Sequence, residues 1–405
     1  MITDSIVISA LLLVAGVVLG WLLAHWGRGG KRASHFKFVS AEYFKGLNYL
    51  LNEQPDKALE VFIRVAEVDS DTVETHFALG SLFRRRGEVD RAIRIHQNLM
   101  ARPSLNREYR AQALFELAQD YLRAGLLDRA ESLLLELLDV PSHTESALRS
   151  LISLYEQQKD WEQAIAMRRR LQTLNGAAQE ETIAQYYCEM AQTALAAKDM
   201  PLARRLLKRA QSQDTDCVRA HLLLAQIEES EEQWERSRQH YGRVLEREIR
   251  YATEVLPALA RVTRELDGHA SLQAVTEKLR RDNPKASGYL AIAAIMDPEL
   301  DDPVSRGCVA DYLRSEPSLR GLYDMFTAFG QQQGMSPVRD LEPLQLAVRK
   351  LLINGPRYRC EECGFRSKTL YWQCPGCKTW NRTIPFHEIT FTAAVPPVLP
   401  EQNRP

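Results

Sequence analysis

The pattern of hydrophobic and polar positions divides this 405-residue chain into three parts. Residues 5–26 form one run without a formally charged side chain, and most of its members are apolar. From about residue 39 to residue 353, apolar positions recur with the spacing of amphipathic helices. Beyond residue 353 that rhythm ends, and paired cysteines and aromatic residues follow. The pattern predicts a membrane-length helix, a long helical array and a small terminal module, in that order.

The uncharged run predicts a transmembrane anchor over residues 1–26. A helix of twenty-two residues rises about 33 Å, enough to cross a hydrocarbon core of about 30 Å. The alternative is a cleavable signal peptide, but such a peptide begins with basic residues, and the charge ahead of this run is Asp4. Basic residues follow the run in a juxtamembrane linker over 27–38 (Arg28, Lys31, Arg32 and Lys37). The positive-inside rule then predicts a cytoplasmic body, with contact to anionic lipid as an alternative role for the linker.

Small residues recur in the helical array at a period of 34. Gly46 and Gly80 stand 34 residues apart, as do Ala58 and Ala92, and two short insertions separate later copies of the pattern. A small side chain allows two antiparallel helices to approach closely. Six copies over residues 39–250 match the tetratricopeptide repeat, a hairpin of helices A and B. Stacked hairpins form a superhelix with an extended concave face, so we expect a surface that binds a peptide or another protein.

Residues 251–353 keep the helical spacing but lose the fixed period, and we interpret them as degenerate helical repeats. Prolines interrupt them, among them Pro284, Pro298, Pro303 and Pro317. An acidic run over residues 228–232 is predicted to be a loop between helices A and B. Cys188, Cys217 and Cys308 lie on helical stretches without partner cysteines at ligand spacing, and we expect them to be buried small hydrophobes.

The terminal module, residues 354–389, carries a CxxC–x10–CxxC pattern formed by Cys360, Cys363, Cys374 and Cys377. Each CxxC turn presents two thiolates, so the pattern predicts a four-cysteine site for one tetrahedral metal ion. A disulfide pair is the alternative, which a reducing cytoplasm disfavours. Tetrahedral sulfur ligation suits both zinc and a single iron, and the spacing does not separate them. Four protein ligands leave no open coordination position, which favours a structural role.

A module of about 30 residues cannot build an adequate hydrophobic core alone, so we expect its folding to depend on the metal. Six aromatic residues are its predicted miniature core and its surface for packing on the last helices: Tyr358, Phe365, Tyr371, Trp372, Trp380 and Phe386. The residues beside the two CxxC turns, or knuckles, are locally basic. We interpret them as a solvated face, with phosphate or membrane contact as the alternative. A Pro-rich tail, residues 390–405, ends the chain.

Composition argues against two classes of function. The chain has 52 basic and 53 acidic residues and a net charge of −1, so it has no bulk positive field to attract nucleic acid. It contains no HExxH, GxSxG or P-loop motif. We therefore expect no enzyme activity, no catalytic residues and no nucleic-acid partner.

The three parts occur together, in this order, in few families. The whole chain resembles the lipopolysaccharide assembly protein B family of Gram-negative bacteria, most specifically in YRCEECGF (358–365) and CPGC (374–377), with Trp372 between them. With the residue pattern, the resemblance implies an all-α tetratricopeptide-repeat superhelix with one N-terminal transmembrane helix and a small C-terminal rubredoxin-like metal module. It favours iron over zinc at the four cysteines. It also places the protein in the inner membrane, with the N-terminus periplasmic and the body facing the cytoplasm.

The resemblance further implies a regulator of lipopolysaccharide synthesis. Members of the family are linked to a membrane-bound AAA metalloprotease, to the lipid A deacetylase that it degrades, and to other inner-membrane proteins of lipopolysaccharide biosynthesis and transport. Our leading hypothesis is a non-enzymatic adaptor that modulates proteolysis of the deacetylase and gathers lipopolysaccharide assembly proteins. The second hypothesis is an electron-transfer protein that uses a four-cysteine iron site. The third is a zinc ribbon that binds nucleic acid through its basic flank.

Overall fold

The computed structural model describes residues 17–19, 21, 42, 44–49, 51–52, 54–68, 73–103, 105–266, 269–283, 285–297, 300, 303–315 and 342–386. Most of the predicted anchor, the basic linker and the Pro-rich tail lie outside these residues. Among the residues that are described, no helix has the length and the hydropathy of a membrane span. The chain divides into two compact units, Met1–Gly176 and Ala177–Pro405, which are taken separately below.

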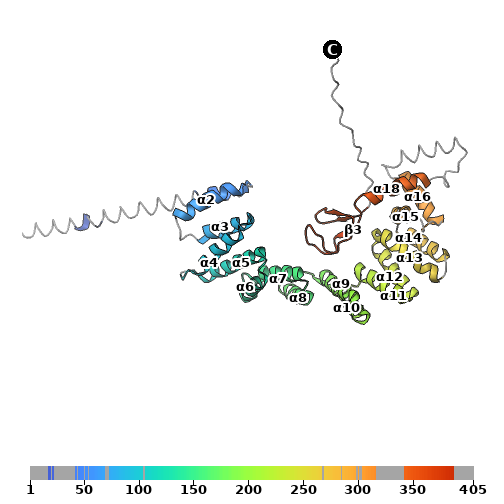
Figure 1. Cartoon of the computed structure of the whole chain (residues 1–405), viewed down its shortest axis with the longest axis horizontal. Helices are drawn as coiled ribbons and strands as arrows, with labels where there is room; N and C mark the ends of the chain where they lie inside the picture. The colour runs from blue at the N-terminus through green and yellow to red at the C-terminus, as the bar shows by residue number, and fades with distance from the viewer. Residues whose placement is uncertain are drawn as a thin grey trace, which may run out of the picture. The chain divides into compact units, whose positions relative to one another are not determined.

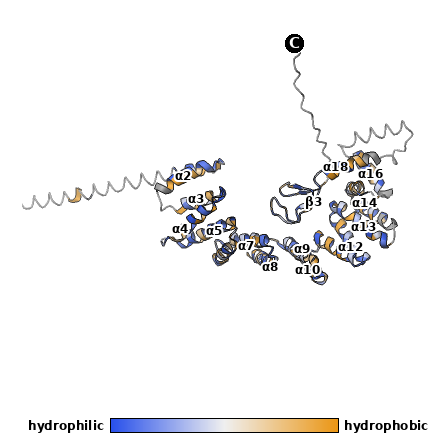
Figure 2. Ribbon diagram, in the orientation of Figure 1, coloured by the Kyte–Doolittle hydropathy of each residue, from blue (hydrophilic) through white to orange (hydrophobic). Residues whose placement is uncertain are grey.

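The first unit is built from helical hairpins (Figure 1). Its named helices are α2 (Pro55–Val68), α3 (Val73–Arg85), α4 (Val89–Met100), α5 (Arg107–Ala124), α6 (Leu127–Leu137), α7 (Thr144–Gln158) and α8 (Trp161–Asn175). Helix α3 packs on α4, α5 on α6 and α7 on α8, and each hairpin contacts the next. Most helices carry both hydrophobic and hydrophilic residues, as helices that bury one face do (Figure 2).

The small residues of the 34-residue pattern lie at the contacts between helices. Those at the start of helix B are fully buried in all six copies: Ala58, Ala92, Ala130, Ala164, Ala203 and Ser237. A Cβ atom on Gly80 of α3 would come within 2.4 Å of the His96 ring of α4, so this contact requires glycine. His96 Nδ1 lies 2.5 Å from the buried Asp120 carboxylate of α5, which also accepts a hydrogen bond from Arg84 at 2.7 Å. This polar cluster joins one hairpin to the next.

The turns between helices A and B use a residue in the left-handed conformation. Gly87 and Gly125 occupy it with φ of 84° and 76°. In the later hairpins Lys159, Lys198 and Glu232 take the same place with φ of 59°, 61° and 59°. The left-handed conformation costs a residue with a Cβ about 1 kcal/mol or more, and glycine avoids that cost. The same turn therefore forms with and without glycine, at different local strain.

The second unit is also built from helical hairpins and ends in the terminal module. Its helices are α9 (Glu180–Ala196), α10 (Met200–Gln213), α11 (Val218–Ser230), α12 (Trp234–Arg247), the short 3-10 helix η1 (Ile249–Tyr251), α13 (Ala252–Leu266), α14 (His269–Asp282), α15 (Ala286–Met296), α16 (Pro303–Ser315) and α18 (Glu342–Asn354). Helices α9 and α10, α11 and α12, and α15 and α16 pack as pairs. The tetratricopeptide fold predicted from the 34-residue period is confirmed.

The prediction of a loop over residues 228–232 is wrong for its first three residues. Helix α11 extends to Ser230, and Glu228 within it is only 4 % exposed. Its carboxylate pairs with Arg204 of α10. The acidic run looked like a solvated loop because sequence alone does not reveal a cationic partner 24 residues away.

The terminal module is a small antiparallel sheet with two cysteine knuckles. Strands β1 (Tyr358–Cys360), β2 (Arg366–Ser367) and β3 (Thr383–Pro385) pair in the order β2-β1-β3. Tyr358 lies opposite Ser367 on one side and Pro385 on the other, and Cys360 lies opposite Thr383. The strands are short, so other contacts must hold the module together.

Candidate metal centre and its surroundings

The first knuckle grows out of the end of β1. The Cys360 backbone N–H donates to the Phe365 carbonyl at 2.8 Å, and the Gly364 N–H donates back to the Cys360 carbonyl at 3.0 Å. This tight turn brings Cys363 back beside Cys360. Gly364 closes it with a φ of 75°, which explains the glycine at this position.

The second knuckle repeats the same hydrogen bonds with a different residue in the turn. The Cys374 N–H donates to the Thr379 carbonyl and the Lys378 N–H to the Cys374 carbonyl, both at 2.9 Å. Lys378 stands where the first knuckle has Gly364, and its φ is 60°. A lysine therefore adopts the glycine conformation here, and the knuckle keeps its shape.

The two knuckles bring four sulfur atoms together. Cys360 Sγ lies 3.7 Å from Cys377 Sγ, and Cys363 Sγ lies 3.6 Å from Cys374 Sγ. All four sulfurs lie within 4.8 Å of one another. With metal–sulfur bonds of about 2.3 Å, a tetrahedral site has sulfur–sulfur edges of about 3.8 Å. The arrangement thus fits one tetrahedral ion, which would lock the knuckles together and contribute the folding energy that so small a module lacks.

Hydrogen bonding prepares one of the sulfurs for ligation. The Thr379 hydroxyl lies 2.8 Å from Cys377 Sγ. Donation from this hydroxyl and from the Thr379 backbone N–H lowers the pKa of Cys377 to about 6. The thiolate is the form that binds a metal, so these hydrogen bonds favour ligation through Cys377 at neutral pH.

Aromatic side chains dock the module on the repeats. Trp372 stacks on Tyr251 of η1, with ring centroids 6.0 Å apart and planes 6° apart. The guanidinium of buried Arg219 in α11 lies 5.5 Å from the centre of the Trp372 ring. Trp380 meets Tyr186 of α9 edge to face at 5.4 Å. The module is therefore seated on α9 and α11, the first helices of two successive hairpins, and on η1.

Polar contacts reinforce this docking. The Tyr358 hydroxyl donates to Glu254 Oε1 of α13 at 2.6 Å, and Arg357 donates to the same oxygen at 3.1 Å. Arg250 of η1 donates to Glu361 of the first knuckle at 2.7 Å. Burial, followed by the hydrogen bond to the Glu254 carboxylate, raises the pKa of Tyr358, so this phenol remains a donor at neutral pH.

The aromatic prediction is right for part of the set and wrong for two members. Tyr358 and Trp380 are 4 % and 8 % exposed, whereas Phe365 is 37 % and Tyr371 is 41 % exposed. The module docks through the side that carries Trp372 and Trp380, and it is too small to cover every aromatic ring. Sequence alone does not distinguish the docked rings from the exposed ones.

The structure also pairs two cysteines that the sequence left apart. Cys188 of α9 and Cys217, the N-cap of α11, are fully buried with their sulfurs 4.0 Å apart. Cys308 is buried in α16, so the predicted burial of all three is confirmed. Metal-ligand spacing in the sequence does not indicate the pair of Cys188 and Cys217, because 29 residues separate them.

The first unit contains a cavity of about 510 Å³ on helices α3 and α5. Its lining includes the carboxylates of Glu74 and Glu108 and the rings of Phe77 and Tyr109, which lie 6.3 Å apart. The Tyr109 hydroxyl donates to the Glu74 carboxylate, which raises the pKa of Tyr109. Carboxylates beside aromatic faces suit a cationic side chain, because both attract positive charge.

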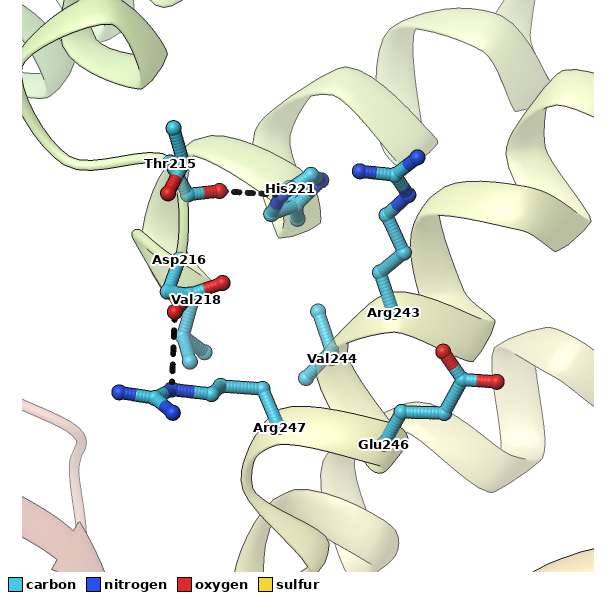
Figure 3. A pocket seen from close by; sticks show the side chains of 8 residues that line it. All are labelled: Thr215, Asp216, Val218, His221, Arg243, Val244, Glu246 and Arg247. Atoms are coloured by element: carbon cyan, nitrogen blue, oxygen red, sulfur yellow. Dashed lines mark hydrogen bonds and ion pairs between the residues drawn. The ribbon is translucent and has the colours of Figure 1, made fainter.

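A second cavity, of about 370 Å³, lies at the start of α11 (Figure 3). His221 Nε2 lies 3.2 Å from the Thr215 carbonyl and therefore carries the hydrogen of the neutral ring. His221 Nδ1 then accepts from His240 Nδ1 at 3.0 Å. Burial lowers the pKa of both histidines, that of His240 to about 4. Arg247 pairs with Asp216 at 3.5 Å, so opposite charges balance within this cavity.

Comparison with known families agrees with this architecture. Residues 358–382 match a rubredoxin metal binding domain, and residues 75–108, 115–177 and 188–252 match tetratricopeptide repeats. Lipopolysaccharide assembly protein B of Escherichia coli K12 is 31% identical over 376 residues, which cover 93% of this chain and 97% of that protein. The protein of the same name from Haemophilus influenzae is 30% identical over 388 residues, with the same shares covered.

Two solved structures align with parts of the chain at low identity. The C-terminal part of a tetratricopeptide-repeat protein from Cytophaga hutchinsonii is 11% identical, with a TM-score of 0.39, over 66% of this chain and 99% of that one. MamA from Desulfovibrio magneticus RS-1 is 15% identical, with a TM-score of 0.33, over 44% of this chain and 95% of that one.

Proposed function

This chain belongs to the lipopolysaccharide assembly protein B family, and from that premise we propose that it is a non-enzymatic adaptor in lipopolysaccharide assembly at the inner membrane. The name of its relatives supports the process. The repeats support the adaptor role, because stacked hairpins offer an extended binding surface. The four-cysteine module supports a structural use of metal, because four protein ligands fill a tetrahedral site.

The observation that carries the proposal is that the two units use the surfaces of their helices differently. In the second unit, α9, α11 and η1 bind the chain's own metal module through Trp372 and Trp380. In the first unit, α3 and α5 instead line the 510 Å³ cavity with its carboxylates and aromatic rings. We assign this cavity to a partner segment that presents a lysine or arginine side chain.

Family membership extends the proposal to particular partners. We propose that the adaptor brings the lipid A deacetylase to a membrane-bound AAA metalloprotease and so modulates its proteolysis, and that it also gathers other inner-membrane proteins of lipopolysaccharide biosynthesis and transport. Residues 1–26 would hold the scaffold in the inner membrane, with the N-terminus periplasmic and the repeats in the cytoplasm. Confinement of two partners on one scaffold raises their effective concentration without new contacts between them. Iron is the proposed metal at the four cysteines, with zinc as the alternative.

Charge reversal in the cavity tests the partner site. In-cell crosslinking with the full chain should show at least a tenfold loss of captured deacetylase or protease for Glu74→Lys, with a matching rise in deacetylase abundance. The matched control is Glu136→Lys, which reverses an exposed charge on α6, outside the cavity. Normal capture by Glu74→Lys would remove the cavity from the proposal.

Deletion of residues 1–26 tests the tether separately. The shortened protein should keep its repeat fold and lose regulation of the deacetylase. Normal regulation at native abundance by the shortened protein would show that tethering is not the mechanism.

Electron transfer is the second candidate function, and one observation favours it. Cys363 is exposed while Cys360 and Cys374 are buried, so one sulfur of the site faces solvent, where a redox partner has access. This function requires iron with a reversible one-electron couple. A zinc-loaded protein that remains fully active in cells would eliminate it.

A further inference from the structure

We propose that Cys188 and Cys217 form a reversible disulfide, which makes them a redox-modification site distinct from the four-cysteine module. Both residues are fully buried and their sulfurs lie 4.0 Å apart. A disulfide bond is about 2.05 Å long, so side-chain rotation and a small helix shift must close a gap of about 2 Å. Helices α9 and α11 already pack together, which keeps the two sulfurs within reach of each other.

The surroundings make the two thiols unequal. Cys217 is the N-cap of α11, so its sulfur lies at the N-terminus of that helix, where the first backbone N–H groups have no partner within the helix. The hydrogen bond with Cys188, together with the Arg219 charge, lowers the pKa of Cys217. The same hydrogen bond and burial raise the pKa of Cys188. Cys217 is therefore the sulfur that reacts first, and Cys188 is the resolving thiol.

The oxidant class is a small peroxide, which enters when the two helices separate locally. The Cys217 thiolate attacks one peroxide oxygen, the O–O bond breaks, and the products are a Cys217 sulfenic acid and one water molecule. The Cys188 sulfur then attacks the Cys217 sulfur, the S–O bond breaks, and a second water leaves. In total, two thiols and one hydrogen peroxide give one disulfide and two waters. A dithiol reductant reverses the bond.

The position of the pair connects it to the docked module. The side-chain amide of Gln185 joins the pair to Arg219. Its Nε2 donates to Cys217 Sγ at 3.5 Å, and its Oε1 accepts from Arg219 at 3.4 Å. Arg219 in turn lies over the Trp372 ring. A disulfide would tie α9 to the start of α11 directly beneath this contact. The oxidised protein should therefore hold the module on a stiffer base.

The test uses the metal-loaded full chain treated with hydrogen peroxide at a few equivalents. Peptide mapping by mass spectrometry should find one peptide pair crosslinked through Cys188 and Cys217, lighter by two hydrogen atoms and restored by dithiothreitol. The melting temperature of the oxidised form should rise by about 5 °C or more, because the bond closes a loop of about 30 residues. Metal content, measured in parallel, should not change.

Three variants separate the site from general thiol oxidation. Cys188→Ala and Cys217→Ala should each abolish the crosslink and the shift in melting temperature, while Cys308→Ala, at the third buried cysteine, should keep both. Circular dichroism checks that each variant folds. Oxidation of Cys217 to sulfinic acid without a crosslink, or metal loss from the four-cysteine module before any reaction at Cys188 and Cys217, would overturn the proposal.

Discussion

The rings of Tyr251 in the repeats and Trp372 in the metal module are stacked, with their centroids 6.0 Å apart and an angle of 6° between their planes. The Tyr251 hydroxyl also donates to the Thr383 carbonyl at 3.3 Å, across 132 residues of sequence. Trp372 and Leu370 pack against a hydrophobic cluster that includes buried residues of α13 and α15. The module is therefore an integral part of the second unit rather than an appendage on a linker.

Replacement of the stacked tryptophan should release the module. Trp372→Ala removes the ring contacts with Tyr251 and Arg219, and we expect the stability of the module to fall by about 2–3 kcal/mol. Hydrogen exchange of the β1 and β3 amides measures this loss. Tyr371→Ala is the matched control, because Tyr371 is the next residue along the chain and is 41 % exposed. It should change the stability by less than about 0.5 kcal/mol. Equal effects of the two variants would show that docking does not stabilise the module.

Removal of the metal should unfold the module and spare the helices. Four thiolates without an ion leave three strands of two or three residues each, too short to persist alone. Chelation should therefore abolish amide protection over residues 358–386 while the helical circular dichroism signal stays nearly constant. Cys374→Ser should reproduce this behaviour without a chelator, and Cys308→Ala should not. Full protection in a verified metal-free protein would contradict the predicted dependence of folding on metal.

The effect of alanine in a hairpin turn should depend on the residue that alanine replaces. Gly125 caps α5 with a φ of 76° and has open space around its Cα, so Gly125→Ala adds left-handed strain and no clash. We expect a loss of about 1 kcal/mol in the unfolding free energy of the first unit, measured by urea denaturation. Lys159→Ala, at the equivalent turn with a φ of 59°, should change it by less than about 0.5 kcal/mol, because the native residue already bears the strain. A neutral Gly125→Ala would show that the turn relaxes freely.

Acid should weaken the second unit through its histidine pair. The pKa of His240 is about 4 in the folded protein, below its ordinary value of 6.5, because burial and the neighbouring His221 oppose its charge. The unfolded chain therefore binds the proton first. The contribution of neutral His240 to the unfolding free energy is fully present above about pH 6.5. It is lost as the pH drops toward 4, a loss of about 1–2 kcal/mol after allowance for partial exposure of the ring.

A pH series of urea denaturations on wild type and His240→Gln measures this contribution. The variant cannot take up a proton at this position, so its stability should fall less steeply between pH 6.5 and pH 4. Parallel curves for the two proteins would exclude His240 as the source of the acid sensitivity.

The sequence by itself determined the features whose partners are close along the chain. The 34-residue period predicted the repeats, because each hairpin closes on a small residue such as Gly80 or Ala92 within one repeat length. The CxxC pairs predicted the knuckles, because two ligands three residues apart meet in a single turn. These local patterns also carried the resemblance to the family, and comparison with its members shows that the chain belongs to it. The anchor predicted over residues 1–26 stays a prediction, because most of it lies outside the described residues.

Only the tertiary structure decided which surfaces meet. The contacts of Tyr358 with Glu254 and of Trp372 with Tyr251 join positions more than 100 residues apart, and no periodicity encodes such pairs. The same holds for Cys188 and Cys217, which look like ordinary buried residues until α9 and α11 pack together. Burial of a side chain depends on what packs over it, so Phe365 and Trp380 have similar patterns in sequence and opposite exposures in the fold.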